Sequence, residues 1–435
     1  MKELEKKIKD KKAKIGVIGL GYVGLPMAVE FGLSGFSVCG FDIDCEKIEK
    51  INKGISYIPD VKTENIAFLV KEKKLSATSD FSKLGDMDII FICVPTPFTK
   101  AKAPDISYII SATDSIKENL KKGQLIILQS TTYPGTTEEI VVPILEGTGM
   151  KVDTDFFVAF SPERIDPGNK VWTIKNTPKV VGGLTEKSTK LSSLLFSQII
   201  EEEKVFPVSS PKAAELCKLL ENTFRAVNIA LVNELTLLCR RMGIDVWEVI
   251  DAASTKPFGF MKFLPGPGVG GHCIPIDPFY LSWKAREYDF STKFIELAAE
   301  TNIMMPRYVA SLVSSALNER KKPMKNSKVL VLGVAFKKDI DDPRYSPSIF
   351  IIELLLKAEV SVSYNDPYIP SIVISGKEFN SKEISKEFIS EQDCVIIATD
   401  HTSYNYKDIV EWANLVIDTR NATAGIENKE KIVRL

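Results

Sequence analysis

A cysteine and an aspartate four residues apart end a glycine-rich segment of this 435-residue chain. The segment reads GPGVGGHCIPIDP over residues 266–278 and contains Cys273 and Asp277. A lone cysteine is more often a small buried hydrophobe than a nucleophile. Glycines let backbone amides approach a phosphate or an oxyanion closely, however, so this setting favours a nucleophilic Cys273.

A lysine and an asparagine form a second group with chemical potential. Lys218 and Asn222 are four residues apart in a helical pattern and so share one helix face, with Arg225 a turn further on. One interpretation is a solvated polar stripe. The other is that Lys218 and Asn222 point at an oxygen that gains negative charge, as in an alkoxide or a tetrahedral intermediate.

A turn near the start of the chain has the spacing of a dinucleotide-binding loop. Gly19, Gly21 and Gly24 follow a predicted strand and open a predicted helix, and Asp42 closes the next strand. The glycines permit a tight turn, close approach of a pyrophosphate, and helix–strand packing. Asp42 can accept hydrogen bonds from ribose hydroxyls and would repel a 2′-phosphate, so the pattern favours NAD over NADP.

The elements that must position these residues alternate between short β-branched runs and amphipathic stretches. The alternation predicts parallel sheets with helices on both faces. The strands expected in the first sheet are residues 14–19, 36–42, 88–94, 124–130 and 156–162. The third of them ends in Val94-Pro95-Thr96-Pro97, where each proline taken alone is a loop stiffener. The strands expected in a second sheet are residues 328–336, 360–367, 394–400 and 415–420.

One helical pattern is longer than a single domain needs. Ser209 and Ser210 can cap a helix that opens at Pro211 and runs to Met242, where Gly243 offers a stop. At 1.5 Å per residue it would be roughly 45–50 Å long. The sequence thus predicts an α/β protein with two Rossmann-like, doubly wound domains joined by a long central helix, and a ligand site in the crevice between the domains. The expected boundaries are 1–208 for the NAD-binding domain, 209–320 for a central helical domain with the cysteine loop, and 321–435 for the C-terminal domain.

Composition excludes several other classes of protein. The 56 basic and 57 acidic residues leave a net charge of −1, so no overall field favours nucleic acid or an anionic membrane. No apolar run is long enough to span a bilayer, and the lysine-rich start, residues 2–14, is expected to be a solvated leader. The seven cysteines are scattered, which predicts reduced thiols in a cytoplasmic protein. Neither of the two histidines has a neighbouring cluster of ligand-type residues, so no metal site is expected.

Ordered motifs make the chain resemble the UDP-glucose/UDP-N-acetylhexosamine 6-dehydrogenase family from residue 13 to 435. The resemblance implies two Rossmann-like domains joined by a long central helix, usually dimerised through that helix, with the UDP-sugar bound by the C-terminal domain. The motifs are GLGYVGLP (19–26), VPTP (94–97), STTYPGTT (130–137), SPERIDPG (161–168), ELCKLLENTFRAVNIALVNEL (215–235), GPGVGGHCIPIDP (266–278) and AFKKDIDDPRYSPS (335–348).

The resemblance also implies a four-electron oxidation that uses two NAD⁺. Cys273 attacks the aldehyde at carbon 6, and the second hydride transfer gives a thioester. Lys218 and Asn222 stabilise oxyanions, Asp277 and Thr131 hold water, and Glu163 assists thioester hydrolysis, which suits the chemistry of these residue types. The cofactor residues implied are Gly19, Gly21, Tyr22, Val23, Gly24, Asp42, Pro95, Thr96, Thr131 and Arg344. The substrate residues implied are Glu163, Arg164, Lys218, Asn222, Arg225, Phe263, Gly268, Gly270, Lys337 at the UDP phosphates, and Arg420.

Two departures from the UDP-glucose members bear on the substrate. His272 precedes Cys273, and Ile276 stands where those members have a lysine before the aspartate. GGHCIPIDPFYL with KPFGF (256–260) is similar instead to the branch that acts on UDP-N-acetylglucosamine, for surface polysaccharide or glycan synthesis. UDP-N-acetylmannosamine and UDP-glucose remain alternative substrates, because a few contacts in the pocket, which one sequence does not display, decide which sugar is preferred. Two other classes of protein are alternatives. A two-electron hydroxyacid or sugar-phosphate dehydrogenase would have no need of Cys273. A non-catalytic NAD-sensing or structural protein would tolerate loss of Lys218, Asn222, Cys273 and Asp277, all of which are present.

Overall fold

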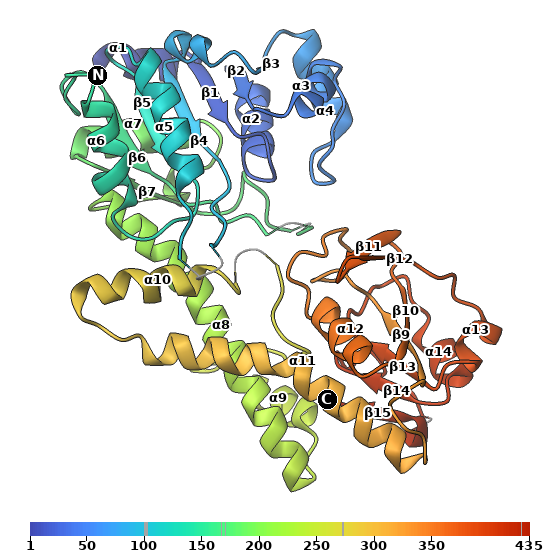
Figure 1. Cartoon of the computed structure of the whole chain (residues 1–435). Helices are drawn as coiled ribbons and strands as arrows, with labels where there is room; N and C mark the ends of the chain where they lie inside the picture. The colour runs from blue at the N-terminus through green and yellow to red at the C-terminus, as the bar shows by residue number, and fades with distance from the viewer. Residues whose placement is uncertain (100–102, 167, 170, 272–273, 428) are drawn as a thin grey trace. The chain divides into compact units, whose positions relative to one another are not determined.

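The chain forms two compact units in the computed structural model, which describes residues 1–99, 103–166, 168–169, 171–271, 274–427 and 429–435. Unit 1 comprises Met1–Glu221 with Trp283–Phe290, and unit 2 comprises Asn222–Ser282 with Ser291–Leu435. Each unit is built round its own sheet (Figure 1). The three-domain division drawn from the sequence stays a prediction beside this two-unit division.

Unit 1 contains an eight-stranded sheet in the order β3-β2-β1-β4-β5-β6-β7-β8. The chain order reverses between β1 and β4, which places a ligand crevice at the carboxyl ends of these strands. All neighbours pair in parallel except β6 and β7, so the expectation of a wholly parallel sheet is wrong at that pair. The strands are β1 (Lys14–Ile18), β2 (Ser37–Phe41), β3 (Leu75–Thr78), β4 (Ile89–Ile92), β5 (Leu125–Leu128), β6 (Phe157–Phe160), β7 (Lys179–Gly183) and β8 (Val205–Val208).

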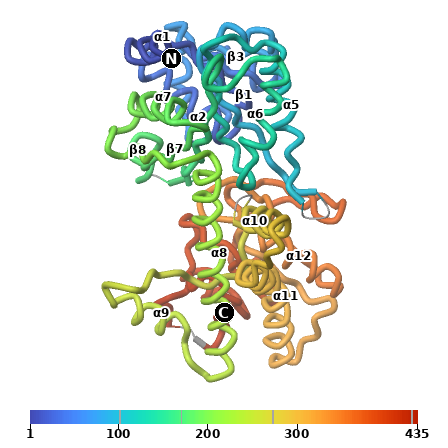
Figure 2. The backbone as a smooth tube through the Cα atoms, turned by 90° about the vertical axis from the view of Figure 1, so that its left-hand side faces the viewer, coloured from blue at the N-terminus to red at the C-terminus, as the bar shows by residue number. Residues whose placement is uncertain are grey.

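Helices cover both faces of this sheet, and a separate buried cluster of apolar side chains fills each interface. Figure 2 shows α2 and α7 on one side of β1 and α5 and α6 on the other. This arrangement confirms the doubly wound fold expected from the sequence. The helices are α1 (Lys2–Lys9), α2 (Gly24–Leu33), α3 (Cys45–Asn52), α4 (Thr63–Lys71), α5 (Ser107–Asn119), α6 (Val142–Glu146) and α7 (Glu186–Phe196), with a π-helical turn η2 (Thr137–Val141) before α6.

The lysine-rich start of the chain is not a solvated leader, as the sequence led us to expect. It forms α1, which packs on α7 and buries Leu4 and Ile8 in the core. Lys7 forms an ion pair with Asp88 at 2.8 Å. The expectation was wrong because two apolar residues four apart make a short buried stripe among charged neighbours.

The long helix α8 spans Pro211–Met242, as predicted. Ser210 accepts the N–H of Ala213 through its hydroxyl, which confirms the expected N-terminal cap. Gly243 follows the last helical residue with a φ of 72°, a left-handed conformation that glycine adopts without strain. The division between the two units falls inside α8, between Glu221 and Asn222.

Unit 2 contains a five-stranded parallel sheet in the order β10-β9-β13-β14-β15, with helices on both faces. One face packs on α11 and α12 and the other on α13 and α14. The strands are β9 (Lys328–Leu332), β10 (Ser361–Asn365), β13 (Cys394–Ile397), β14 (Val416–Asp418) and β15 (Ile432–Arg434), with a hairpin of β11 (Ser371–Ile374) and β12 (Lys377–Asn380). The helices that lie wholly in this unit are α9 (Val246–Ser254), α11 (Lys293–Glu319), α12 (Pro347–Lys357), α13 (Lys386–Ser390) and α14 (Tyr406–Trp412), while α10 (Asp277–Ala285) begins in unit 2 and ends in unit 1.

Three further observations concern membrane spans, metal-ligand groups and the cysteines. No described helix is long and apolar enough to cross a membrane. Within the same residues, no group of three metal-ligating side chains occurs. The six cysteines that the structure describes are free thiols.

Candidate active site

The glycine turn after β1 leaves room for a ligand at only one of its glycines. A Cβ on Gly24 would lie 1.9 Å from the carbonyl oxygen of Gly19, so α2 starts in direct contact with the turn. A Cβ on Gly19 would lie 2.6 Å from the carbonyl oxygen of Cys93. Around Gly21, by contrast, no described atom lies within 4 Å of such a Cβ. Tyr22 and Val23 complete the turn, and its open side fits a pyrophosphate at the N-terminus of α2.

Asp42 follows the last residue of β2 and binds the same turn. Its Oδ2 accepts the N–H of Leu20 at 2.8 Å, and its Oδ1 accepts the N–H of Asp44 at 3.0 Å. The hydroxyl of Tyr57 donates to the carbonyl of Leu20 at 2.6 Å. Burial, and then the charge of Asp42, raise the pKa of Tyr57, so Tyr57 stays a neutral donor. Asp42 therefore lies fixed beside the glycine turn, where an NAD ribose is expected.

The ends of β4 and β5 are joined by side-chain hydroxyls. Thr96 donates to the carbonyl oxygen of Thr131 at 2.7 Å, and Ser130 donates to that of Val94 at 2.7 Å. Pro95 lies exposed between the partners. The predicted residues Pro95, Thr96 and Thr131 therefore share one loop cluster at the carboxyl edge of the sheet.

Glu163 lies just past the end of β6, and its carboxylate accepts four hydrogen bonds. Oε1 accepts the backbone N–H groups of Arg164 and Ile165 at 2.7 and 2.9 Å. Oε2 accepts hydrogen bonds from Nε2 of Gln129 at 2.7 Å and from Nζ of Lys179 at 2.8 Å. Lys179 is the first residue of β7, and because β7 runs antiparallel to β6, its start lies at the carboxyl end of β6. The antiparallel strand thus brings a buried cation to Glu163.

Burial and charge set the protonation of this cluster. Burial raises the pKa of Glu163, but the charge and hydrogen bond of Lys179 with two backbone N–H groups outweigh it, so the pKa lies below its usual value. Burial lowers the pKa of Lys179 against the attraction of Glu163, and nearby Lys218 lowers it further. Burial raises the pKa of Cys93, whose thiol lies 3.5 Å from Oε1 of Gln129. The cluster therefore holds an ionised carboxylate beside a neutral thiol, with Lys218 close by.

Glu215, three residues before Lys218 in α8, is a buried acceptor. It accepts the N–H of Gly135 at 2.5 Å, and the N–H and hydroxyl of Thr137 at 2.9 and 2.6 Å. Burial, opposed by these hydrogen bonds, raises the pKa of Glu215 to about 7. Glu215 thereby fastens the loop that carries Thr131 to the helix that carries Lys218.

Arg164, a predicted substrate residue, is engaged in unit 1. Its guanidinium forms an ion pair with Glu221 and donates to the carbonyl of Pro178 at 3.0 Å. It also contacts the sulfur of Cys217. These bonds hold Arg164 against the start of α8.

Asn222 and Asp277 meet in unit 2. Both side chains are buried, and Nδ2 of Asn222 donates to Oδ2 of Asp277 at 2.5 Å. Asp277 is the first residue of α10. Cys273 and His272 lie outside the described residues, so the chain places Asp277 four residues beyond the predicted nucleophile without showing the thiol.

The glycine segment before Cys273 packs against the C-terminal part of unit 2. Asn233 accepts the N–H of Gly266 at 3.0 Å. A Cβ on Gly266 would lie 2.7 Å from the Arg420 guanidinium, and one on Gly270 would lie 2.7 Å from Cβ of Phe336. Gly268 has a φ of 131°, and its Cβ position lies 3.3 Å from Pro347. The segment thus needs glycine, and it lies beside Arg420 and the 336–347 loop that carries Lys337.

The remaining predicted residues of unit 2 are spread over three elements. Phe263 contacts Phe224 of α8 with ring centroids 5.8 Å apart. Arg225 is exposed on α8 and Lys337 is half-buried. Arg344 forms a bidentate pair with Asp342, in which Nε donates to Oδ1 at 2.9 Å and Nη2 donates to Oδ2 at 2.6 Å. The roles assigned to these residues, including that of Arg344 at NAD, stay predictions.

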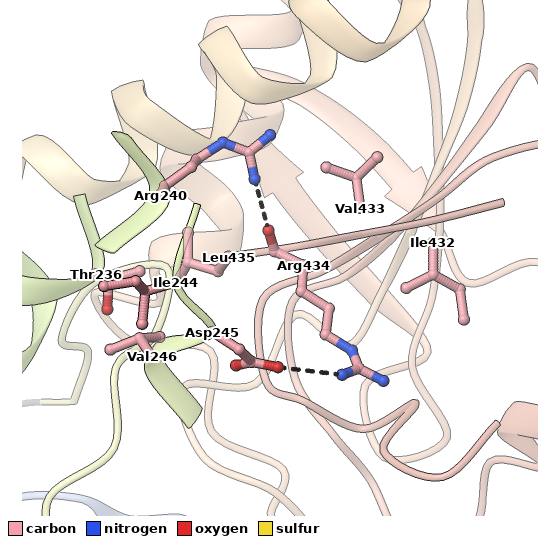
Figure 3. A pocket seen from close by; sticks show the side chains of 9 residues that line it. All are labelled: Thr236, Arg240, Ile244, Asp245, Val246, Ile432, Val433, Arg434 and Leu435. Carbon is pink, nitrogen blue, oxygen red and sulfur yellow. Dashed lines mark hydrogen bonds and ion pairs between the residues drawn. The ribbon is translucent and has the colours of Figure 1, made fainter. Parts of the chain in front are cut away.

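A cavity of about 390 Å³ in unit 2 contains none of the predicted site residues. In Figure 3, Arg240 donates to the carbonyl of Arg434, whose guanidinium faces Asp245. Apolar side chains line much of the rest. Its lining residues are Thr236, Arg240, Ile244, Asp245, Val246, Ile432, Val433, Arg434 and Leu435.

Sequence reasoning missed three polar side chains of the site: Gln129, Lys179 and Glu215. Gln129 lies at the end of the predicted strand 124–130, and a polar residue at that position was a usable signal. Lys179 opens the short strand KVVGG, whose pattern does not reveal an antiparallel direction. Glu215 is a charged residue in a helical pattern, and its partners Gly135 and Thr137 are about eighty residues away in sequence.

Three models of one protein family match successive segments of the chain. They describe the NAD binding domain, the central domain and the UDP binding domain of the UDP-glucose/GDP-mannose dehydrogenase family, at residues 13–200, 212–303 and 330–425. A UDP-N-acetyl-D-glucosamine 6-dehydrogenase from Pseudomonas aeruginosa is 38% identical over 91% of this chain and 92% of its own.

Two solved structures are similar over nearly the whole chain. A UDP-D-ManNAc dehydrogenase from Pyrococcus horikoshii has a TM-score of 0.86 at 34% identity, covering 94% of this chain and 96% of its own. An NDP-N-acetyl-D-galactosaminuronic acid dehydrogenase from Methanosarcina mazei has a TM-score of 0.83 at 34% identity, covering 100% and 97%.

Proposed function

Because the chain belongs to the UDP-glucose/GDP-mannose dehydrogenase family and is an NAD-dependent UDP-sugar 6-dehydrogenase, we propose that it oxidises UDP-N-acetylglucosamine to UDP-N-acetylglucosaminuronic acid. The alcohol at carbon 6 is oxidised to an aldehyde and then to a carboxylate. NAD⁺, which the turn of Gly19, Gly21 and Gly24 would hold, would supply the hydride acceptor for both oxidations. The observation that carries the proposal is the buried hydrogen bond between Asn222 and Asp277. Asp277 follows Cys273 by four residues in the sequence.

Cys273 is the proposed nucleophile. Its thiolate attacks the aldehyde carbon, and loss of hydride from the resulting thiohemiacetal leaves a thioester that water hydrolyses. Lys218 and Asn222 stabilise the oxyanions that form on the sugar oxygen. Asp277 and Thr131 hold the water, and the buried contact with Asn222 keeps the Asp277 carboxylate in one orientation.

Glu163 is proposed to assist thioester hydrolysis as a proton acceptor. A useful acceptor must be ionised at the working pH. The four hydrogen bonds and the Lys179 cation favour that state. Lys179 therefore supports the reaction through Glu163 and without touching substrate.

The N-acetylated substrate is proposed on a local observation. Ile276, directly before Asp277, is buried and uncharged, whereas the UDP-glucose branch has a lysine there. An apolar side chain suits a bulkier acetamido group. UDP-N-acetylmannosamine is the second candidate, because the Pyrococcus horikoshii structure named for that sugar matches 94% of the chain.

We also propose a homodimer that pairs through α8. Its unit 2 part exposes Leu231, Leu235, Leu238 and Met242, with exposed fractions between 40% and 61%. Their spacing places them on one helix face, and such an apolar stripe is typical of an interface. The scattered free thiols favour a cytoplasmic location, where disulfides are rare.

The test is the number of NADH molecules formed per molecule of sugar consumed. The purified protein would be given UDP-N-acetylglucosamine, UDP-N-acetylmannosamine and UDP-glucose in parallel. Two NADH with UDP-N-acetylglucosamine, at the highest kcat/KM, are expected. One NADH per sugar would contradict the four-electron scheme, and a higher kcat/KM for another sugar would reassign the substrate.

A further inference from the structure

The segment that carries Lys337 is anchored on both sides by buried side chains. Three and two residues before Lys337, the backbone N–H groups of Val334 and Ala335 donate to Oδ2 of Asp366 at 2.7 and 3.0 Å. Two residues after it, the N–H of Asp339 donates to Nδ1 of His401 at 2.9 Å. Neither anchor belongs to the set of residues assigned to the reaction.

The two anchoring side chains form one buried pair. His401 is fully buried and Asp366 is 3% exposed. Because Nδ1 of His401 accepts a hydrogen bond, the ring proton is on Nε2, which faces Oδ2 of Asp366 at 3.0 Å. The rings of Tyr368 and Tyr404 enclose the imidazole, with centroids 5.0 and 5.7 Å away. The pair is therefore held in one geometry, with an acceptor aimed at the Lys337 segment.

The segment needs outside support because its own backbone does not favour this shape. Asp339 has a φ of 61°, in the left-handed region that costs energy for a residue with a side chain. Thr402 adds two further bonds, since its N–H and hydroxyl donate to Oδ1 of Asp339 at 2.9 and 3.0 Å. Residues just after β13 thus hold the turn that follows Lys337.

A comparison with unit 1 shows what is unusual about Asp366. Asp42 follows β2, beside the central strand β1, and is placed to bind a cofactor ribose. Asp366 follows β10, which pairs with β9 in the second sheet as β2 pairs with β1 in the first. Here the Asp366 carboxylate accepts hydrogen bonds from His401 and from backbone N–H groups, so the same position in the fold holds the Lys337 segment.

We propose that His401, oriented by Asp366, is a positioning residue for diphosphate binding: its Nδ1, as a hydrogen-bond acceptor, holds the Lys337 segment in the shape that receives the UDP phosphates. This inference rests on the proposed function, in which Lys337 contacts those phosphates. His401 touches neither substrate nor cofactor and acts through the Asp339 backbone.

Two near-isosteric substitutions separate positioning from simple packing. Asparagine places its amide near Nδ1 of a histidine, and glutamine places its amide near Nε2. His401→Asn therefore retains an acceptor for the Asp339 N–H, whereas His401→Gln retains the contact with Asp366 and loses that acceptor. Loss of one such hydrogen bond corresponds to about a tenfold effect.

The measurement is the affinity of the full-length variants for UDP and for NAD⁺ by calorimetry, together with steady-state kinetics. His401→Gln should weaken UDP binding and raise the KM for the UDP-sugar about tenfold, with kcat and NAD⁺ affinity within about twofold of wild type. His401→Asn should stay within about threefold. Equal losses of UDP affinity in both variants, or none in His401→Gln, would overturn the inference.

Two further measurements distinguish the possible failures. Lys337→Ala should weaken UDP binding. If it does not, the assignment of Lys337 is wrong; if it does while His401→Gln binds UDP normally, only the role of His401 is wrong. In the wild-type protein, UDP at about ten times its Kd should slow amide exchange at Asp339 about tenfold, because UDP binds the anchored state. Unchanged exchange there would contradict the inference even if the variants do not fold.

Discussion

Replacing Lys179 by methionine removes the cation that faces Glu163 and retains the length of the side chain. The carboxylate retains its bonds to Gln129 and to two backbone N–H groups. Burial, which raises the pKa of Glu163, then acts without the opposing charge of Lys179. Removing one partner of a buried ion pair costs about 3–5 kcal/mol, so Lys179→Met should destabilise unit 1 by that amount at about pH 8.

The cost should depend on pH in a definite direction. In the wild type the pKa of Glu163 is lowered, so the pair stabilises the fold above the unfolded pKa and the stabilisation is lost as the pH falls. In Lys179→Met the pKa of Glu163 is raised, and protonation of the carboxyl relieves the unpaired charge. The destabilisation relative to wild type should therefore shrink by about 2 kcal/mol between about pH 8 and about pH 5.

The assay is amide hydrogen exchange in β5 and β6, which reports the opening free energy of unit 1 itself. Glu163→Gln and the double variant complete a thermodynamic cycle. Because glutamine carries no charge, the double variant should be about 2 kcal/mol more stable than Lys179→Met alone. Equal destabilisation at both pH values, or additive effects of the two substitutions, would refute the ion-pair argument.

Three further predictions concern the cofactor site and the loop of Thr131. Asp42→Ala should raise the KM for NAD⁺ about tenfold or more and relax the rejection of NADP⁺, measured by steady-state kinetics with both cofactors; unchanged cofactor kinetics would mean that the ribose lies elsewhere. Gly21→Ala should leave stability within about 0.5 kcal/mol of wild type, because its Cβ meets open space. It should weaken NAD⁺ binding, because that space is where the pyrophosphate is expected. Gly24→Ala should unfold more easily, because its Cβ meets the carbonyl of Gly19. Denaturation and NAD⁺ titration of both variants check this, and a Gly24→Ala protein as stable as Gly21→Ala would contradict it. With its pKa raised to about 7, ionisation of Glu215 should reduce stability by about 3 kcal/mol as the pH rises from about 4.5 to about 7. Glu215→Gln should lack that slope in a pH series of denaturation curves, and an identical slope in both proteins would count against it.

The regular elements of the fold were predictable because their patterns are local. The alternation of strand and helix, the glycine turn at Gly19 and the helix from Pro211 to Met242 depend on neighbouring residues, and the structure agrees with each. Features that depend on distant contacts were not predictable. The direction of the strand that begins at Lys179 depends on its pairing with β6. The burial of Leu4 depends on a distant helix, α7.

In the candidate site too, residues in local motifs were predictable and partners that are distant in sequence were not. Glu163 could be named from its motif, but its partners Gln129 and Lys179 come from separate strands and meet only in the folded sheet. The histidine pair is a similar case. His401 and Asp366 are thirty-five residues apart, and no local pattern joins them.

The central claim is that oxidation passes through a covalent thioester on Cys273, and the most direct test is the Cys273→Ser variant. NAD⁺ affinity, NADH yield and intact protein mass would be measured after mixing it with UDP-N-acetylglucosamine. The account predicts wild-type NAD⁺ binding and either no turnover or a stable ester on the protein, because an alkoxide leaves far less readily than a thiolate. Sustained turnover with two NADH per sugar in this variant would contradict the covalent scheme.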